Sequence, residues 1–392
     1  MVQYHPFDES ILDEPFQIFK QLRDEAPAYY LEEFDTWFIS RFADIWDLQS
    51  DQCNFTSKNG ITTTHLLTHQ TPNAPNLTGY DGEQHTRIRG YFNPHFKPAA
   101  ARALEARTRE LAREAVGRVI DTGRADALAD LGGYVSVRVA CTILGIPLED
   151  ADMIMDWVNT YFEREPGHRG STERGTQAAK EFGLYLFKLS GQVRREGNAP
   201  EGSVLHRLLN AELEGKICDD RDIAIHLNMM AIGGTETFPK IFSALLFRLW
   251  QNKDQRARVA ADAGLAPWAF HETLRYDMPT HMLGRSIQHG FELHGNRLEP
   301  GAGIMFMFGS ANRDEREFDD PDVFDIDRRA PRILSFGVGQ HMCLGAHIAK
   351  LEGRVLLEEV LRRIPHYEVD ESGIERLCSE FVRGFWCMPI VF

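Results

Sequence analysis

The sequence predicts a mainly α-helical fold with minor β structure, arranged as a single domain with a helix-rich core and small sheets at its edge. Long stretches with apolar residues at helical spacing occupy much of the 392-residue chain. Short apolar segments typical of strands lie mostly towards the two ends. No linker rich in Pro, Gly or Ser divides residues 1–392, so we predict one domain rather than several.

The individual elements follow from these patterns. The predicted helices cover residues 99–121, 135–144, 180–195 and 220–252. The predicted strands cover residues 28–31, 36–39, 290–293 and 388–392. The longest helix has an aspartate, Asp219 or Asp220, at its predicted N-cap. Two segments, 56–81 and 166–172, have little periodicity and are predicted to be either binding loops or plain surface loops.

The composition argues against several functional classes. The 43 basic and 58 acidic residues give a net charge of −15, which disfavours nucleic acid or an anionic membrane as a general partner. Residues 1–8 show the pattern of neither a signal peptide nor a membrane anchor. The apolar stretch 227–250 contains charged residues and is predicted to be a buried helix. Six scattered cysteines without a C-x-x-C pair favour free thiols, so we expect a cytoplasmic protein.

The most informative segment is residues 336–345, Phe-Gly-Val-Gly-Gln-His-Met-Cys-Leu-Gly, which runs into a predicted helix. Backbone N–H groups and the helix dipole favour a thiolate at Cys343. The surrounding glycines let the backbone approach a large flat ligand closely. We therefore predict that Cys343 presents one sulfur to a metal. The alternative is an ordinary buried cysteine in a tight loop.

A second motif lies in the longest predicted helix, at residues 232–239, Ile-Gly-Gly-Thr-Glu-Thr-Phe-Pro. Glycine lowers helix stability and proline removes a helical hydrogen bond, so we expect the helix to loosen here. An acid and a hydroxyl, Glu236 and Thr237, follow one another at this weak point. In a cleft they would relay protons from solvent to a ligand. The alternative is a kinked core helix with a capped threonine.

The cysteine segment resembles the haem-binding signature of the cytochrome P-450 superfamily, Phe-Gly-x-Gly-x-His-x-Cys-x-Gly, and the resemblance covers nearly the whole chain. It implies a soluble, bacterial-type haem-thiolate monooxygenase, with haem b as cofactor and Cys343 as the axial iron ligand. Residues 336–352 would form the haem-binding loop and the following helix. Residues 220–252 would form the central oxygen-activating helix, with Glu236 and Thr237 as its acid–alcohol pair.

The same resemblance implies roles for residues that would otherwise be ordinary. His85 and Arg89, four apart on one helix face, match partners of the haem propionates. The other implied cofactor-binding residues are Arg285, His341, Phe336, Gly337, Gly345, Gly233 and Gly234. Glu272, Arg275 and Arg328 match a structural triad that braces the haem loop.

The implied activity is hydroxylation of a small apolar substrate with dioxygen and two electrons from a separate ferredoxin- or flavodoxin-like donor. Terpenoid, steroid, fatty-acyl and aromatic substrates all fit. Two alternatives stay open: a haem-thiolate enzyme that performs desaturation, coupling or rearrangement, and a non-enzymatic haem-thiolate sensor. The predicted substrate pocket comprises Phe238, Thr280, His281, Met282, Phe381 and Val382. In it His281 is the polar group that faces the substrate, or else a structural histidine bonded to backbone.

A small basic island is predicted on the helix that follows the cysteine loop. His347, Lys350 and Arg354 share one face of that helix, with Arg328 or Arg329 nearby. On a protein of net charge −15, such an island would steer an acidic electron donor to this face. The alternative is an ordinary solvated helix face. We expect no nucleic-acid partner and no membrane partner.

Overall fold

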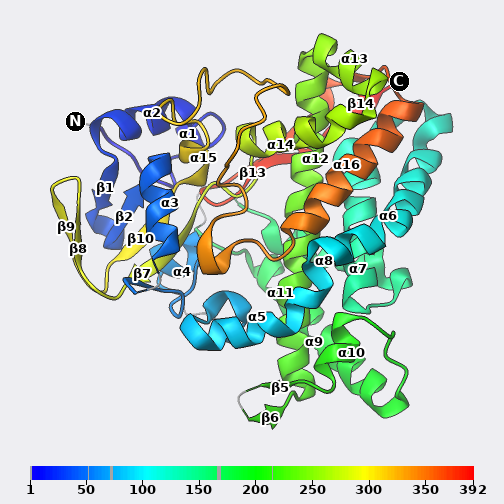
Figure 1. The fold of residues 1–392 in the computed structure, drawn as a ribbon, viewed down its shortest axis with the longest axis horizontal. Coiled ribbons are helices and arrows are strands. Elements are labelled where there is room, and N and C mark those ends of the chain that lie inside the picture. Colours follow the sequence, from blue (N-terminus) through cyan, green and yellow to red (C-terminus); the bar gives the residue numbers. More distant parts are fainter. Residues whose placement is uncertain (1, 52, 71–73, 166–168, 214) are drawn as a thin grey trace. The chain divides into compact units, whose positions relative to one another are not determined.

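The computed structural model describes residues 2–51, 53–70, 74–165, 169–213 and 215–392. Over these residues the protein is mainly helical with small sheets, as the sequence predicts (Figure 1). The chain forms two compact units, each built from three segments, and each is described separately. Unit 1 comprises Met1–Thr86, Trp268–Cys343 and Glu375–Trp386. Unit 2 comprises Arg87–Pro267, Leu344–Ile374 and Cys387–Phe392.

The centre of unit 1 is a five-stranded sheet in the order β1-β2-β10-β7-β3. Its strands are β1 (Ala28–Leu31), β2 (Thr36–Ile39), β3 (Phe55–Thr56), β7 (Leu283–Ile287) and β10 (Gly303–Phe306). β10 runs parallel to β2, and the other neighbouring strands are antiparallel. β1 and β2 have the predicted bounds. The turn between them ends at Asp35, whose left-handed backbone (φ 45°) lets the chain reverse.

Alternating side chains of this sheet feed two apolar clusters, because successive residues of a strand point to opposite faces. Ile39 and Phe306 lie in one cluster, Phe38 and Met305 in the other. The helices of unit 1 are α1 (Glu9–Leu12), α2 (Phe16–Glu25), α3 (Phe42–Ser50), α4 (Thr63–Leu67), α14 (Ala266–Tyr276, which begins at the boundary) and α15 (Phe308–Ala311). Two hairpins, β8 (Phe291–Leu293) with β9 (Asn296–Leu298) and β12 (Glu375–Cys378) with β13 (Arg383–Cys387), complete it.

Of the two segments predicted as loops, 56–81 is only partly irregular, whereas residues 169–172 of the other contain no helix or strand. Helix α4 lies within residues 56–81, and the Thr62 hydroxyl caps it by accepting from the His65 N–H at 3.3 Å. This helix has little apolar periodicity, so the sequence pattern missed it. In each predicted loop a few residues, 71–73 and 166–168, lie outside the described part of the chain.

Unit 2 is a helical bundle with a small sheet, β4 (Arg124–Asp126), β11 (Glu368–Val369) and β14 (Pro389–Val391), and a short hairpin, β5 (Glu212–Leu213) with β6 (Lys216–Ile217). Its helices are α6 (Pro98–Val119), α7 (Tyr134–Leu144), α8 (Ala151–Phe162), α9 (Glu173–Glu196), α10 (Val204–Leu208), α11 (Asp220–Thr235), α12 (Thr237–Gln251), α13 (Lys253–Ala261) and α16 (Ala346–Arg363). Helix α5 (Gly82–Phe96) begins in unit 1 and continues into unit 2. Helix α16 packs along α6, and α9 packs against α8 and α11 (Figure 1).

The predicted single helix 220–252 is wrong in one respect: it is two helices, α11 and α12, that meet at Glu236. The interruption falls where the glycines and Pro239 weaken the helix, since proline cannot donate the backbone bond that a continuous helix requires. Asp219 is the N-cap of α11. Its carboxylate accepts from the backbone N–H groups of Arg221 and Asp222, both at 2.9 Å.

One segment has the length and apolar content of a membrane span. It is Ala127–Leu144, with a mean hydropathy of 1.4, and 67% of it is buried inside the protein. It consists of a π-helical stretch, Ala127–Gly133, followed by α7. Both pieces pack against other helices of unit 2, as the core helix of a globular bundle does. Among the described residues it is the one segment with these properties.

Candidate functional site

The cysteine loop of unit 1 is a tight turn packed against α3. Gly337 and Gly339 have left-handed φ values of 64° and 76°. A Cβ at Gly339 would lie 2.8 Å from the Gln49 carbonyl oxygen, so a side chain there would collide with α3. The Cys343 N–H donates to the Phe336 carbonyl at 2.7 Å and closes the loop. The Cys343 side chain is exposed, as a sulfur that binds a ligand must be.

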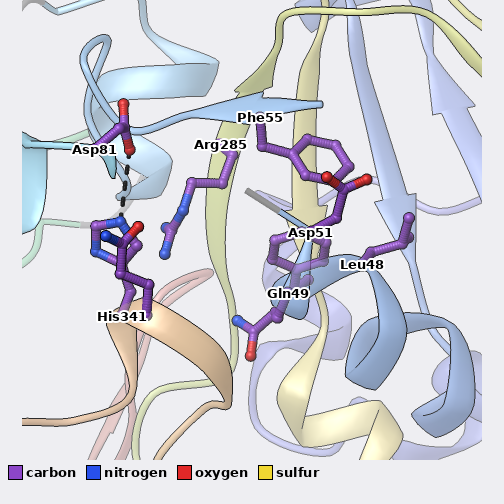
Figure 2. A pocket seen from close by; sticks show the side chains of 9 residues that line it. Leu48, Gln49, Asp51, Phe55, Asp81, Arg285 and His341 are labelled. Atoms are coloured by element: carbon purple, nitrogen blue, oxygen red, sulfur yellow. Dashed lines mark ion pairs between the residues drawn. The ribbon is translucent and has the colours of Figure 1, made fainter. Parts of the chain in front are cut away.

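Two histidines implied to bind propionates, His85 and His341, lie together in unit 1. Their ring centroids are 4.3 Å apart. His341 Nε2 lies 3.5 Å from Asp81 Oδ1 (Figure 2). Although burial alone would raise the pKa of Asp81, hydrogen bonds from His341 and from two neighbouring donors lower it to about 2. Asp81 is therefore ionised at neutral pH and holds the imidazole of His341. The sequence analysis gave Asp81 no role.

Arg285, on β7, lines the same cavity as Asp81 and His341 (Figure 2). Burial lowers its pKa to about 10, an effect that Asp81 partly opposes, so the guanidinium is charged at neutral pH. Its Nη1 donates to the Gly284 carbonyl at 2.7 Å. Within the described ranges no carboxylate forms an ion pair with it. A partly desolvated cation of this kind is costly until an anion joins it.

These residues fit a haem. Arg285, His85 and His341 supply cationic or donor groups for the propionate carboxylates, and Cys343, two residues after His341, supplies the thiol. Arg89 follows His85 by one helical turn on α5 and is half-buried. Gly345 is the residue before α16 and serves as its N-cap. The donor set matches an axial sulfur ligand together with a receptor for two carboxylates.

The three residues implied to brace the cysteine loop lie together in unit 1. Arg275 donates twice to Glu272, at 2.9 and 2.7 Å, and Arg328 Nε donates to the same carboxylate at 3.2 Å. Arg275 Nη1 also donates to the Asn312 carbonyl at 2.9 Å. The Asn312 side chain accepts from the Leu334 N–H at 2.8 Å, just before the cysteine segment. Asn312 thus couples the triad to the loop, a link that the sequence pattern did not reveal.

The acid–alcohol pair lies in unit 2, at the junction of α11 and α12. Glu236 is buried and Thr237 is half-buried. Gly234 lies against α7, where an added Cβ would be 3.3 Å from the Ala140 Cβ, while Gly233 is exposed.

The junction is packed closely on its other side. The π-helical stretch Ala127–Gly133 lies directly against it, since a Cβ at Gly132 would be 2.8 Å from the Pro239 Cα. Backbone therefore meets backbone at this contact, and the position of the junction is defined by packing as well as by the proline.

The junction also carries a charge that the sequence analysis did not assign. Lys240 Nζ lies 2.7 Å from Glu236 Oε1, and both side chains are 4% exposed. The same ammonium donates to the Glu236 backbone carbonyl at 3.2 Å. The spacing of four residues between an acid and a lysine was visible in the sequence, but its burial was not.

Five of the six predicted pocket residues lie in unit 1. Thr280 and Val382 form an isolated antiparallel bridge. The His281 N–H donates to the Phe381 carbonyl at 2.9 Å. Met282 is buried in one of the two apolar clusters of the sheet. The remaining pocket residue, Phe238, is in unit 2, where its ring stacks on that of Phe242 at 5.9 Å.

The His281 ring packs into the interior of unit 1. Its centroid lies 6.2 Å from that of Phe16 and 6.0 Å from that of Phe19. A Cβ at Gly309 would be 3.2 Å from the ring. Burial, aided by the positive charge of Arg383, lowers the pKa of His281 to about 3, so the ring is neutral. These contacts favour the structural alternative for this residue over a role as the polar group of the pocket.

The predicted basic island on α16 is smaller than the sequence suggests. His347 and Lys350 are exposed, but Arg354 pairs with Glu105 at 2.7 Å and with Glu358 at 3.1 Å. Its charge is neutralised within the contact between α6 and α16. Arg328 is engaged by Glu272 in unit 1.

Comparison with known proteins gives a consistent result. The family model described as cytochrome P450 matches residues 3–377. A putative cytochrome P450 123 from Mycobacterium tuberculosis is 33% identical over 387 residues, which cover 98% of this chain and 96% of the relative. Cytochrome P450-terp from a Pseudomonas species is 30% identical over 403 residues, which cover 96% and 93%.

The fold agrees with solved structures as well. Cytochrome P450 CREJ, in complex with (4-ethylphenyl) dihydrogen phosphate, superimposes with a TM-score of 0.87 at 27% identity, covering 100% of this chain and 99% of that one. Members of this family are haem-thiolate oxidoreductases that bind haem b. Since the match extends over nearly the whole chain in both sequence and fold, the protein belongs to the cytochrome P450 family.

Proposed function

We propose that this oxidoreductase is a monooxygenase that hydroxylates a small apolar molecule, with Cys343 as the axial ligand of its haem b. The observation that carries the proposal is the half-buried Arg285 guanidinium, which lines the cavity next to the cysteine loop and lacks an ion-paired carboxylate among the described residues. Haem propionates are the anions that this cation requires. His341, from the same segment of unit 1 as Arg285, and His85, from the N-terminal segment, add further donors.

When bound, haem b supplies dioxygen activation, and its axial thiolate favours O–O bond cleavage. The protein's own residues hold and orient it. The Cys343 sulfur would bind the iron, while Arg285, His85, His341 and Arg89 would hold the propionates. The bond network from Glu272 and Arg275 through Asn312 keeps the loop in place.

Protons reach the dioxygen side through the junction of α11 and α12. Glu236 takes up a proton from water at its carboxylate and passes it to the Thr237 hydroxyl, which gives its own proton onward. The break between α11 and α12 supports this role, because it leaves backbone groups at the junction without the hydrogen bonds of a continuous helix. Without directed proton delivery, the two electrons would be spent on reducing dioxygen to hydrogen peroxide, which is then released.

The substrate class rests on the predicted pocket residues other than His281, which are mainly apolar: Thr280, Met282, Phe381 and Val382 in unit 1 and Phe238 in unit 2. Terpenoid, steroid, fatty-acyl and aromatic molecules fit such a lining, and a spectral-shift screen of these compounds on the ferric protein would separate them. We place the enzyme in the cytoplasm.

The electron donor is a separate ferredoxin- or flavodoxin-like protein that docks near the exposed Lys350. Since Arg354 is neutralised by its partners, Lys350 and His347 are the residues of this face that would attract the acidic donor. Lys350→Glu should slow reduction by the donor, more so at low than at high ionic strength. A reduction rate insensitive to both changes would place the donor elsewhere.

The assignment is tested with the reduced protein and carbon monoxide. The wild type should show the strongly red-shifted Soret band of a thiolate-bound haem, and Cys343→Ser should lose it. Cys53→Ser, at another exposed cysteine of unit 1, is the control and should keep the band. A red-shifted band that persists in Cys343→Ser would overturn the assignment. Turnover under isotopically labelled dioxygen then separates hydroxylation, whose product carries the label, from desaturation, coupling or rearrangement.

A further inference from the structure

Lys240 is the buried charged residue of α12 that the proposed function does not use. It lies in a run of buried side chains from Phe238 to Phe247, where a lysine is out of place. Only a few kinds of partner make a buried ammonium tolerable, and here the partner is the acid of the proposed relay. The ion pair between Lys240 Nζ and Glu236 Oε1, at 2.7 Å, is therefore a built feature of the junction.

The pair has little freedom to move. Lys240 Nζ also donates to the Glu236 backbone carbonyl at 3.2 Å, so the same ammonium contacts both the carboxylate and the backbone carbonyl of Glu236. The ring of Phe162, from α8, lies 6.0 Å from the ammonium. Pro239, between the two charged residues, is packed against Gly132. The lysine thus approaches the carboxylate from the α12 side along a defined direction.

We propose that Lys240 is a positioning residue for proton delivery: its ammonium holds Glu236 Oε1, so that Oε2 takes up the proton and passes it on. The inference rests on the proposed function of Glu236. In the step, Glu236 Oε2 gains a proton from water and loses it to the Thr237 hydroxyl, while Lys240 stays protonated throughout. No electron moves through the pair, and the carboxylate ends in the state in which it began.

The test uses the haem-loaded protein with dioxygen as the only acceptor, so that no organic substrate has to be identified. An electrode-reduced or ferredoxin-reduced enzyme converts dioxygen to hydrogen peroxide with two electrons and two protons, or to water with four of each. Lys240→Met should lower the rate of water formation by between about tenfold and a hundredfold, because a misplaced acid delivers protons poorly. The share of electrons recovered as peroxide should rise accordingly.

Infrared spectroscopy supplies a readout that does not depend on turnover. In Lys240→Met the Glu236 carboxyl has lost its cation and should appear as a protonated acid, because a buried carboxylate without a partner takes up a proton. That band should be absent from the wild type and from the double variant with Glu236→Gln. Lys240→Arg keeps the charge and should restore water formation in large part.

The double variant Glu236→Gln with Lys240→Met guards against misfolding, since removing both charges leaves no buried ion unpaired. Its peroxide share should equal that of Glu236→Gln alone, because Lys240 acts only through Glu236. The positioning role is refuted if Glu236→Gln changes the peroxide share while Lys240→Met has the peroxide share of the wild type and shows no new carboxyl band. If Glu236→Gln behaves as wild type while the band still appears in Lys240→Met, it is the relay itself that fails.

Discussion

Two cations withdrawn from water, one in each unit, differ in their partners: Lys240 is buried, and Arg285 is half-buried in the cavity of unit 1. In unit 2, Lys240 Nζ lies 2.7 Å from a carboxylate oxygen of Glu236, at the junction of α11 and α12. In unit 1, Arg285 forms no ion pair with any described carboxylate. Burying a charge is costly, so each must be compensated. The protein compensates Lys240 itself and leaves Arg285 to a ligand. The difference shows that a buried cation paired within the protein belongs to its internal structure, whereas a half-buried cation that lines a cavity without a carboxylate partner marks a place where an anion binds.

Arg275 is the extreme case of internal pairing and should show the largest effect. Arg275→Met would leave the Glu272 carboxylate buried, since Glu272 is 2% exposed, with only part of its pairing. We expect the free energy of unfolding to fall by about 3–5 kcal/mol, as for other broken buried pairs. Chemical denaturation of the haem-loaded protein measures it. Arg297→Met, at an exposed pair, is the control and should change stability by less than about 0.5 kcal/mol.

Arg285→Met should behave in the reverse manner. Removing a half-buried charge that has no carboxylate partner should leave the stability of the apoprotein unchanged or raised, while haem is lost faster. A hydrogen bond to a charged group contributes about 1.5–3 kcal/mol, so dissociation should quicken about tenfold or more. Thermal unfolding of the apoprotein measures its stability, and the rate of haem transfer to apomyoglobin measures the loss of haem. An apoprotein destabilised as strongly as Arg275→Met would show that Arg285 has an internal partner after all.

The smallest effect should come from Asp81, which is half-buried beside His341. Its pKa is about 2 in the folded protein and 3.8 ordinarily, so it stabilises the fold above about pH 4, and this contribution is lost as the pH falls towards 2. Solvent screening limits the contribution to about 1 kcal/mol. The stability difference between wild type and Asp81→Asn should be constant from pH 7 to 5 and shrink below pH 4. If the stability difference between wild type and Asp81→Asn grows as the pH falls, the stabilising role of the Asp81 carboxylate is contradicted.

Local patterns predicted the elements that depend on local interactions. β1 and β2 follow from a short apolar alternation and a turn at Asp35, all within a dozen residues, and their predicted bounds are correct. The weak point near Glu236 was predicted from glycine and proline alone, although the complete break was not. Helix α4 escaped because threonine-rich segments carry no apolar stripe.

The candidate site was predicted only as far as a family signature reaches. Cys343, His341 and the triad belong to the signature, so the sequence alone pointed to them. The link from Asn312 to Leu334, and the packing of His281 against Phe16, join segments that are distant in the chain. No periodicity encodes such contacts. The pairing of Lys240 was encoded by spacing, but spacing does not reveal burial, and burial is what gives the pair its importance.

The contact between Gly132 and Pro239 has a consequence for how this enzyme can be altered by mutation. A Cβ at position 132 would lie 2.8 Å from the Pro239 Cα, which is a backbone atom that no rotamer change can move away. Substitutions at positions 132 and 239 are therefore expected to be coupled. In a combinatorial library, any larger residue at 132 should survive only together with a second change that shifts the start of α12. A single substitution at Gly132 should therefore disturb the junction proposed for proton delivery, although the stretch Ala127–Gly133 carries none of its chemistry.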